Sequence, residues 1–157
     1  MKANNINITQ SILINCSKDK VFDYVSNYGK DKYWRKIIHE TQVETSPIKV
    51  GALLTESSFL SKKYPNYITR FKCVSLEANQ SVTCETTTDN LFWSKNTRSV
   101  EAFDKEQCKF TYHFELDSSI VKYAFGFSLP AFLIQFTTQL EMKSYLKALK
   151  KLLEQKS

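Results

Sequence analysis

The residue types that most often carry chemistry are sparse in this sequence. It has 2 histidines, His39 and His113, and 4 cysteines that form no CxxC pair. A zinc site needs three or four His, Cys or carboxylate ligands at recognisable spacing, and we find no such set. We expect His113 on the outer face of a strand and His39 at a helix–strand junction, in surface or hydrogen-bonded roles. We therefore predict no metal site and no cofactor.

Candidates for a nucleophile or an acid–base pair are equally weak. The motifs GxSxG, HExxH and GxxxxGK[ST] are absent, which removes support for hydrolase, zincin and P-loop chemistry. Cys108 shares its strand face with four apolar or aromatic residues in "CKFTYHFEL", and an apolar setting raises the pKa of a thiol and makes it inert. Glu56 and Glu85 could move protons, but strand alternation is expected to turn both outward. We therefore predict no catalytic residue, and an enzyme is less expected than a binding protein.

A second set of residues mixes aromatic rings with small hydroxyl groups, as the lining of an apolar ligand pocket does. In "YITRFKCVS", the residues Tyr67, Thr69, Phe71 and Cys73 share one side of a strand. The alternative, a filled core whose hydroxyl groups find internal partners, stays open. The candidate ligand-binding residues are Ser57, Phe59, Tyr67, Thr69, Phe71, Trp93, Phe110, Tyr112, Phe132 and Phe136.

The elements that must position these residues follow from hydrophobic periodicity. Ile6, Ile8, Ile12 and Ile14 recur at even positions, which predicts a strand. Ser17 can cap a short helix that Gly29 would end, and a second short helix would carry Trp34 as a structural anchor. About six antiparallel strands follow, and after Pro130 a helical period returns for about two dozen residues. We predict an α+β fold with a curved antiparallel sheet of six to seven strands around one long C-terminal helix.

The segment "IVKYAFGFSLP" at 120–130 joins the last strand to the long helix. Its aromatic residues and Gly126 fit a mobile lip over a pocket. A rigid extension of the long helix, broken near Gly126–Pro130, is the alternative.

Size and charge fit one domain over 1–157. The 157 residues contain 42% hydrophobic and 13% aromatic residues and carry a net charge of +6, which does not by itself indicate nucleic acid. Without an apolar leader or a 20-residue apolar span, we expect a cytoplasmic protein with free thiols. The lysines of the long helix, Lys143, Lys147, Lys150 and Lys151, are expected to be solvated, or alternatively to contact an anionic membrane surface transiently.

The order of elements resembles the helix-grip fold of the START-like (SRPBCC) superfamily of polyketide cyclase/dehydrase and lipid-transport proteins. Local motifs agree: "VFDYVSNYGKDKYW" after the first strand, "VGALLTE" at 50–56 and "YLKALKKLLE" at 145–154. Asn27 stands where many members have Asp, which preserves a capping role but not a charge.

The resemblance implies a cavity between sheet and helix for lipids, polyketides or other hydrophobic molecules. Fold alone does not choose between carrier and enzyme. We expect binding or transport of a hydrophobic small molecule, with a polyketide cyclase/dehydratase-like enzyme as the alternative, and we expect no binding of nucleic acid.

Overall fold

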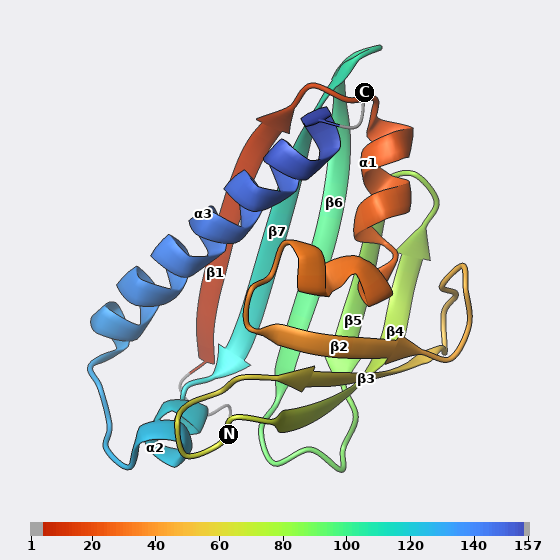
Figure 1. The fold of residues 1–157 in the computed structure, drawn as a ribbon. Coiled ribbons are helices and arrows are strands. Elements are labelled where there is room, and N and C mark those ends of the chain that lie inside the picture. Colours follow the sequence, from red (N-terminus) through yellow and green to blue (C-terminus); the bar gives the residue numbers. More distant parts are fainter. Residues whose placement is uncertain (1–4, 156–157) are drawn as a thin grey trace.

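The computed structural model of the protein describes residues 5–155 (Figure 1). Within these residues, seven strands and four helical segments follow one another in this order: β1 (Asn5–Ile14), α1 (Lys18–Val25), the 3₁₀ helix η1 (Tyr28–Tyr33), β2 (Ile38–Val43), β3 (Leu53–Ser58), β4 (Tyr67–Glu77), β5 (Ser81–Thr86), β6 (Ser94–Asp104), β7 (Gln107–Asp117), α2 (Ser119–Phe125) and α3 (Ala131–Gln155).

The strands form one antiparallel sheet in the order β1-β7-β6-β5-β4-β3-β2. From β2 to β7 each strand pairs with the next one in sequence, so β2 lies at one edge. At the other edge, β1 pairs with β7 from Asn5–Asp117 to Ile14–Cys108. The sheet curls and α3 runs across its hollow side, as Figure 1 shows. The predicted helix-grip architecture is therefore confirmed.

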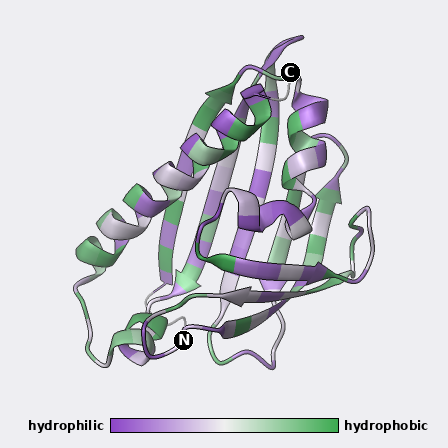
Figure 2. Cartoon of the chain, in the orientation of Figure 1, coloured by the Kyte–Doolittle hydropathy of each residue, from purple (hydrophilic) through white to green (hydrophobic). Residues whose placement is uncertain are grey.

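Helix α3 joins the core along part of its surface only. Hydrophobic residues recur along α3 and the strands (Figure 2), and the buried ones of α3 include Ile134, Met142, Tyr145 and Leu149. They pack with β1 and β7 residues such as Ile8 into one hydrophobic cluster. No helix within residues 5–155 has the length and apolar character needed to cross a membrane.

The short helices differ in detail from the prediction. Ser17 caps α1 as expected, because its hydroxyl accepts from the Lys20 amide, but the helix already ends at Val25. Gly29 instead lies inside η1, which begins where the Asn27 side chain accepts from the Gly29 amide at 3.2 Å. The second helix is thus earlier and tighter than predicted, because the Asn27 cap starts a new turn. The capping role predicted for Asn27 is confirmed.

Trp34 follows η1 and is almost fully buried. Its indole ring meets the rings of Phe110 and Tyr112 on β7 edge-on, with centroids 6.1 and 5.8 Å apart. It therefore fixes η1 to the concave face of the sheet, as the structural interpretation of Trp34 predicted.

Candidate functional site

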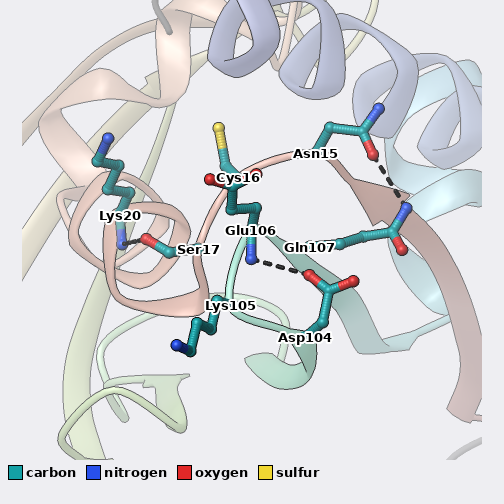
Figure 3. Close-up of a pocket in the computed structure, with 8 residues that line it drawn as sticks. All are labelled: Asn15, Cys16, Ser17, Lys20, Asp104, Lys105, Glu106 and Gln107. Atoms are coloured by element: carbon teal, nitrogen blue, oxygen red, sulfur yellow. Dashed lines mark hydrogen bonds between the residues drawn. The ribbon is translucent and has the colours of Figure 1, made fainter.

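A polar groove of about 660 Å³ lies between the start of α1 and the β6–β7 turn (Figure 3). Its lining groups mostly bond one another: Gln107 donates to Asn15, and the Asp104 carboxylate accepts from the Glu106 amide. Cys16 points its thiol at the Leu153 carbonyl. The groove contains none of the predicted site residues and little apolar lining, so its size does not make it the candidate site.

The candidate site is a cavity of about 510 Å³ between the curled sheet and α3. Its volume lies within the usual range for small-molecule sites, about 300–1,000 Å³. Strands β3, β4, β6 and β7 supply one wall, and α2 and α3 supply the other. The lining is mainly apolar and aromatic, with polar groups toward one side, where Arg35, Glu56, Asn96, Tyr112 and Glu141 contribute.

Strand alternation places many of the predicted residues on this wall. Six of the candidates line the cavity, namely Phe59, Tyr67, Thr69, Phe71, Trp93 and Tyr112. Phe114 and Leu116 continue the inward face of β7 beyond Tyr112. The mixture of rings and hydroxyl groups anticipated for β4 therefore faces an open volume. Whether these residues bind a ligand stays a prediction.

The remaining candidates do not line the cavity. Phe110 is fully buried against Trp34 and belongs to the solid part of the core. Phe132 and Phe136 lie on the outer side of α3, 72% and 57% exposed, because Ile134, Thr137 and Thr138 take its inner side. Ser57 faces away from the cavity, since β3 turns the alternate residues inward.

The alternation of β3 also corrects the prediction for Glu56. Leu54, Glu56 and Ser58 are the buried residues of this strand, so Glu56 points inward and lines the cavity at 7% exposure. The short segment "LLTESS" has leucines at both parities, and the parity that carries a charge is the buried one. Glu85 does not line the cavity; its carboxylate accepts from the Trp93 indole N–H at 3.0 Å.

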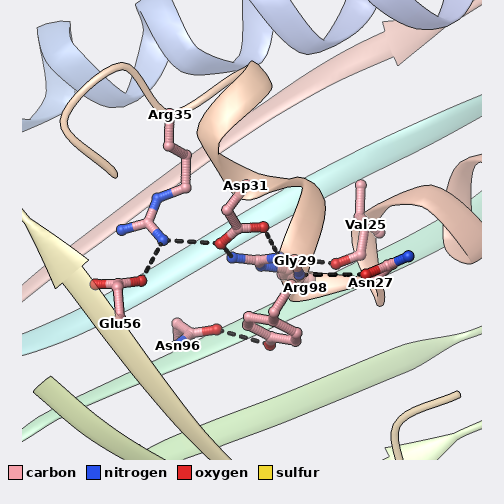
Figure 4. Close-up of polar contacts among 9 residues, drawn as sticks. Val25, Asn27, Gly29, Asp31, Arg35, Glu56, Asn96 and Arg98 are labelled. Atoms are coloured by element: carbon pink, nitrogen blue, oxygen red, sulfur yellow. Dashed lines mark hydrogen bonds and ion pairs between the residues drawn. The ribbon is translucent and has the colours of Figure 1, made fainter. Parts of the chain in front are cut away.

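Glu56 is buried because it belongs to an ionic network (Figure 4). Arg35 Nη1 bonds both the Glu56 and Asp31 carboxylates at 2.9 Å. Arg98 donates to the Asp31 carboxylate from both Nη1 and Nη2, at 2.8 and 2.5 Å. Its Nη1 also donates to the Val25 carbonyl. Two guanidinium groups thus balance two carboxylates, which is the arrangement that buried charges require.

Aromatic rings complete the surroundings of Arg98. Its guanidinium lies 3.8 Å from the ring centroid of Tyr28, and the rings of Trp34 and Tyr112 are 5.1 and 5.3 Å away. Burial alone would lower the pKa of Arg98, but Asp31 and the Tyr28 oxygen raise it above its ordinary value. Arg98 is therefore a permanent cation, and cation–π contact partly replaces its lost hydration.

Arg35 differs from Arg98 because it borders the cavity. Both of its ion pairs use Nη1, and within the described residues its buried Nε has no hydrogen-bond partner. Burial would lower the pKa of Arg35, but Tyr112, Glu56 and Asp31 together hold that pKa well above its usual value. Arg35 lines the cavity, and a charged donor on a cavity wall can bind an oxygen acceptor of a guest molecule.

Helix α3 contributes a second polar pair. The Tyr145 hydroxyl donates to the Glu141 carboxylate at 2.5 Å. Burial, followed by this hydrogen bond, raises the pKa of Tyr145, so its hydroxyl keeps its proton. Glu141 itself lines the cavity and can accept a further hydrogen bond from a guest hydroxyl group.

Helix α2 covers one end of the cavity and is held by side-chain contacts. The Ser61 hydroxyl donates to the Ala124 carbonyl at 2.7 Å, and the ring of Tyr123 stacks on that of Tyr64 at 4.3 Å. Gly126 ends the helix in the left-handed conformation, with φ of 82°. Residues 120–130 are thus a separate short helix and a loop, not a continuation of α3. Whether they open as a lid is a prediction.

The histidines and cysteines have structural surroundings. His39 bonds the Pro65 carbonyl and His113 bonds the Thr9 hydroxyl, at 2.8 and 2.6 Å. All four cysteines are free and buried. Within residues 5–155, no cluster of three or more His, Cys, Asp or Glu side chains could hold a metal ion.

No family model and no curated protein matches the sequence. Solved structures do: a START superfamily protein from Mycobacterium smegmatis superposes with a TM-score of 0.76 at 10% identity, over 96% of this chain and 99% of that chain. The chain has the START-like fold.

Two further structures share the START-like fold. The di-domain ARO/CYC StfQ from the steffimycin biosynthetic pathway matches with a TM-score of 0.73 at 9% identity, over 97% of this chain and 51% of that chain. Truncated norcoclaurine synthase from Thalictrum flavum matches with a TM-score of 0.63 at 13% identity, over 98% and 96% of the two chains. Such low identities establish the fold, and the site must be argued from its own residues.

Proposed function

We propose that the protein binds a hydrophobic small molecule that carries at least one polar oxygen, in the cavity between the sheet and α3. The observation that carries this proposal is the cavity of about 510 Å³, which has aromatic walls and the charged side chain of Arg35 in its lining. Burial of apolar ligand surface would supply most of the affinity, at about 25 cal/mol per Å². Arg35 and Glu141 would orient the ligand's polar group.

Other features support the kind of ligand and the location that we propose. Norcoclaurine synthase from Thalictrum flavum, which has this fold, was solved with dopamine and hydroxybenzaldehyde. Both are small aromatic molecules with oxygen groups, the kind of guest that fits an aromatic cavity with polar groups at one side. The four free thiols suit a reducing compartment, and we keep the cytoplasm as the proposed location.

The test is a binding measurement with a cavity-filling variant. N-phenyl-1-naphthylamine, a neutral probe that fluoresces in apolar surroundings, should bind the wild-type protein. Thr69→Trp places an indole ring in the cavity and should weaken binding about tenfold or more. Ile68→Trp adds the same ring on the exposed face of β4 and should leave binding unchanged. Equal affinities for both variants would remove the cavity as the binding site.

Polar recognition is tested by competition between matched ligands. 2-Acetonaphthone should displace the probe more strongly than naphthalene, because its carbonyl oxygen can accept from Arg35. A charge-assisted hydrogen bond is worth about 1.5–3 kcal/mol, or roughly tenfold or more in affinity. Indistinguishable affinities would leave an apolar site without a polar anchor.

A second candidate function is catalysis on a carbonyl compound in the same cavity, as in a cyclase. It is favoured by one observation, that a fixed guanidinium (Arg35) and a carboxylate (Glu141) share the cavity wall. Such a pair can stabilise an enolate and accept a proton. Solvent deuterium exchange into a bound methyl ketone, dependent on Glu141, would support turnover. Its absence would leave binding alone.

A further inference from the structure

The end of the molecule formed by α2 and the first turns of α3 exposes a large apolar surface. Figure 1 places this end opposite the β6–β7 turn, and Figure 2 shows its largely hydrophobic colouring. We call it the α2–α3 surface. It consists of the exposed side chains of Phe125, Phe127, Phe132, Leu133, Phe136 and Leu140. Soluble proteins rarely expose so many large apolar groups together without a partner.

Helix geometry explains why these groups cannot turn inward. Phe132, Phe136 and Leu140 are four residues apart, so they form one stripe along α3. The opposite side of α3 is committed to the core through Ile134 and Met142. Before the helix, the rings of Phe125 and Phe127 lie 6.4 Å apart on either side of Gly126. The packing of the inner side of α3 over the cavity therefore keeps this apolar stripe on the outside of the molecule.

The same stripe becomes cationic further along α3. Lys143 and Lys147 continue its phase, and both are exposed. No ion pair within residues 5–155 involves either of them. Lys150 is different: it donates to the Leu13 carbonyl and pairs with Glu154, both at 2.7 Å, so it is removed from the predicted set of contact lysines.

The distribution of charge along the sequence also favours contact with an anionic partner. Between Asp117 and Glu141 the chain carries no acidic residue, and its only charge is Lys122 on α2. An apolar surface bordered by uncompensated lysines matches a bilayer interface that has anionic head groups. The same surface of a second copy would present the same lysines and, between Asp117 and Glu141, no acidic residue to receive them.

We propose that the α2–α3 surface docks on a membrane that contains anionic lipids. The phenylalanines enter the boundary between head groups and acyl chains, and Lys143 and Lys147 contact the head groups. The inner side of α2, with Val121 and Ala124, lines the cavity, so docking would bring the cavity's end to the membrane. The docking itself does not depend on the identity of any ligand.

The test is flotation of the protein with vesicles of phosphatidylcholine, with and without phosphatidylserine. We expect binding that requires phosphatidylserine and weakens as salt is added. F132S/F136S should reduce partitioning about tenfold or more through lost apolar burial. K143E/K147E should reduce it by a similar factor and abolish the salt dependence.

Matched controls lie at the opposite end of the molecule. Phe103→Ser removes a phenylalanine that is 66% exposed, and K105E/K109E reverses two exposed lysines. Both should partition like the wild type. The proposal is overturned if the wild type does not bind phosphatidylserine vesicles, or if controls and surface variants lose binding equally. It is also overturned if sedimentation reveals a dimer that F132S/F136S disperses, since a second copy would then occupy the surface. Probe binding without vesicles tests the cavity separately.

Discussion

The ionic network at the cavity's polar side makes a strong prediction about stability. Replacing Arg98 by Met keeps an unbranched side chain of similar length but removes the cation. Asp31 would lose two of its three charged hydrogen bonds, and the Val25 carbonyl would lose its donor. Neither group can reach water, because Asp31 and Val25 are both 0% exposed.

The expected loss follows from this burial. Breaking a buried ion pair by removing one partner costs about 3–5 kcal/mol, because the remaining charge stays desolvated and underpaired. We therefore expect R98M to lower the free energy of unfolding by about that amount, a large share of the 5–15 kcal/mol typical of a domain. R98K, which keeps the charge but not the forked geometry, should cost less. The D31N/R98M double variant should cost about 2 kcal/mol less than the two single losses combined.

Urea unfolding followed by circular dichroism measures these differences. The control is R70M, which breaks the Arg70–Asp89 pair at 3.5 Å, whose side chains are 59% and 58% exposed. An exposed pair contributes about 0–1 kcal/mol, so R70M should be nearly neutral. If R98M destabilised the protein no more than R70M, the network would not be a stabilising part of the fold, and the reasoning would be refuted.

Three further predictions concern the core and the cover of the cavity. Phe110→Ala should cost about 3–5 kcal/mol in urea unfolding, as expected for a core residue; a neutral result would mean that Phe110 borders open space after all. Ser61→Ala should increase amide exchange in 119–125 about fivefold through the lost hydrogen bond, and unchanged exchange would show that α2 is held by its rings alone. Burial raises the pKa of Cys84 to about 12 and that of Cys108 to about 11, from the ordinary 9.0. Because the folded pKa is the higher one, the stability these thiols contribute is complete below pH 9.0 and falls as the pH rises toward those values. Alkaline unfolding midpoints that do not change in Cys84→Ala would contradict this.

Much of the fold was predictable because hydrophobic periodicity reports directly on which face is buried. On β7 the inward residues Cys108, Phe110 and Tyr112 alternate strictly with polar ones, and the structure buries them. On β4, Tyr67, Thr69 and Phe71 face inward for the same reason. Long, regular elements carry enough repeats for the period to be read safely.

The predictions were wrong at positions where a charged residue is buried or an apolar residue is exposed. Strand β3 is short, with leucines at both parities, so the ion pair of Glu56 decides which face is inward. On α3, the apolar stripe of Phe132 and Phe136 has the right period for a core helix, but at this end the inner side is already supplied by Ile134. Hydrophobic periodicity predicts which face of a helix is apolar. It does not say whether the rest of the protein covers that face.

The network itself shows why the cavity's polar side escaped sequence reasoning. Asp31 and Arg35 are spaced i,i+4, which on most helices indicates an exposed pair. Arg98 sits in "NTRSV", in phase with Asn96 and Val100, and this inward phase was the one available signal. A charge in an inward phase is reasonable only if a counter-charge meets it, and that counter-charge comes from a residue 67 positions away. Because Arg35 lines the cavity and Arg98 does not, the structure separates a cation that holds the fold from one that can meet a guest.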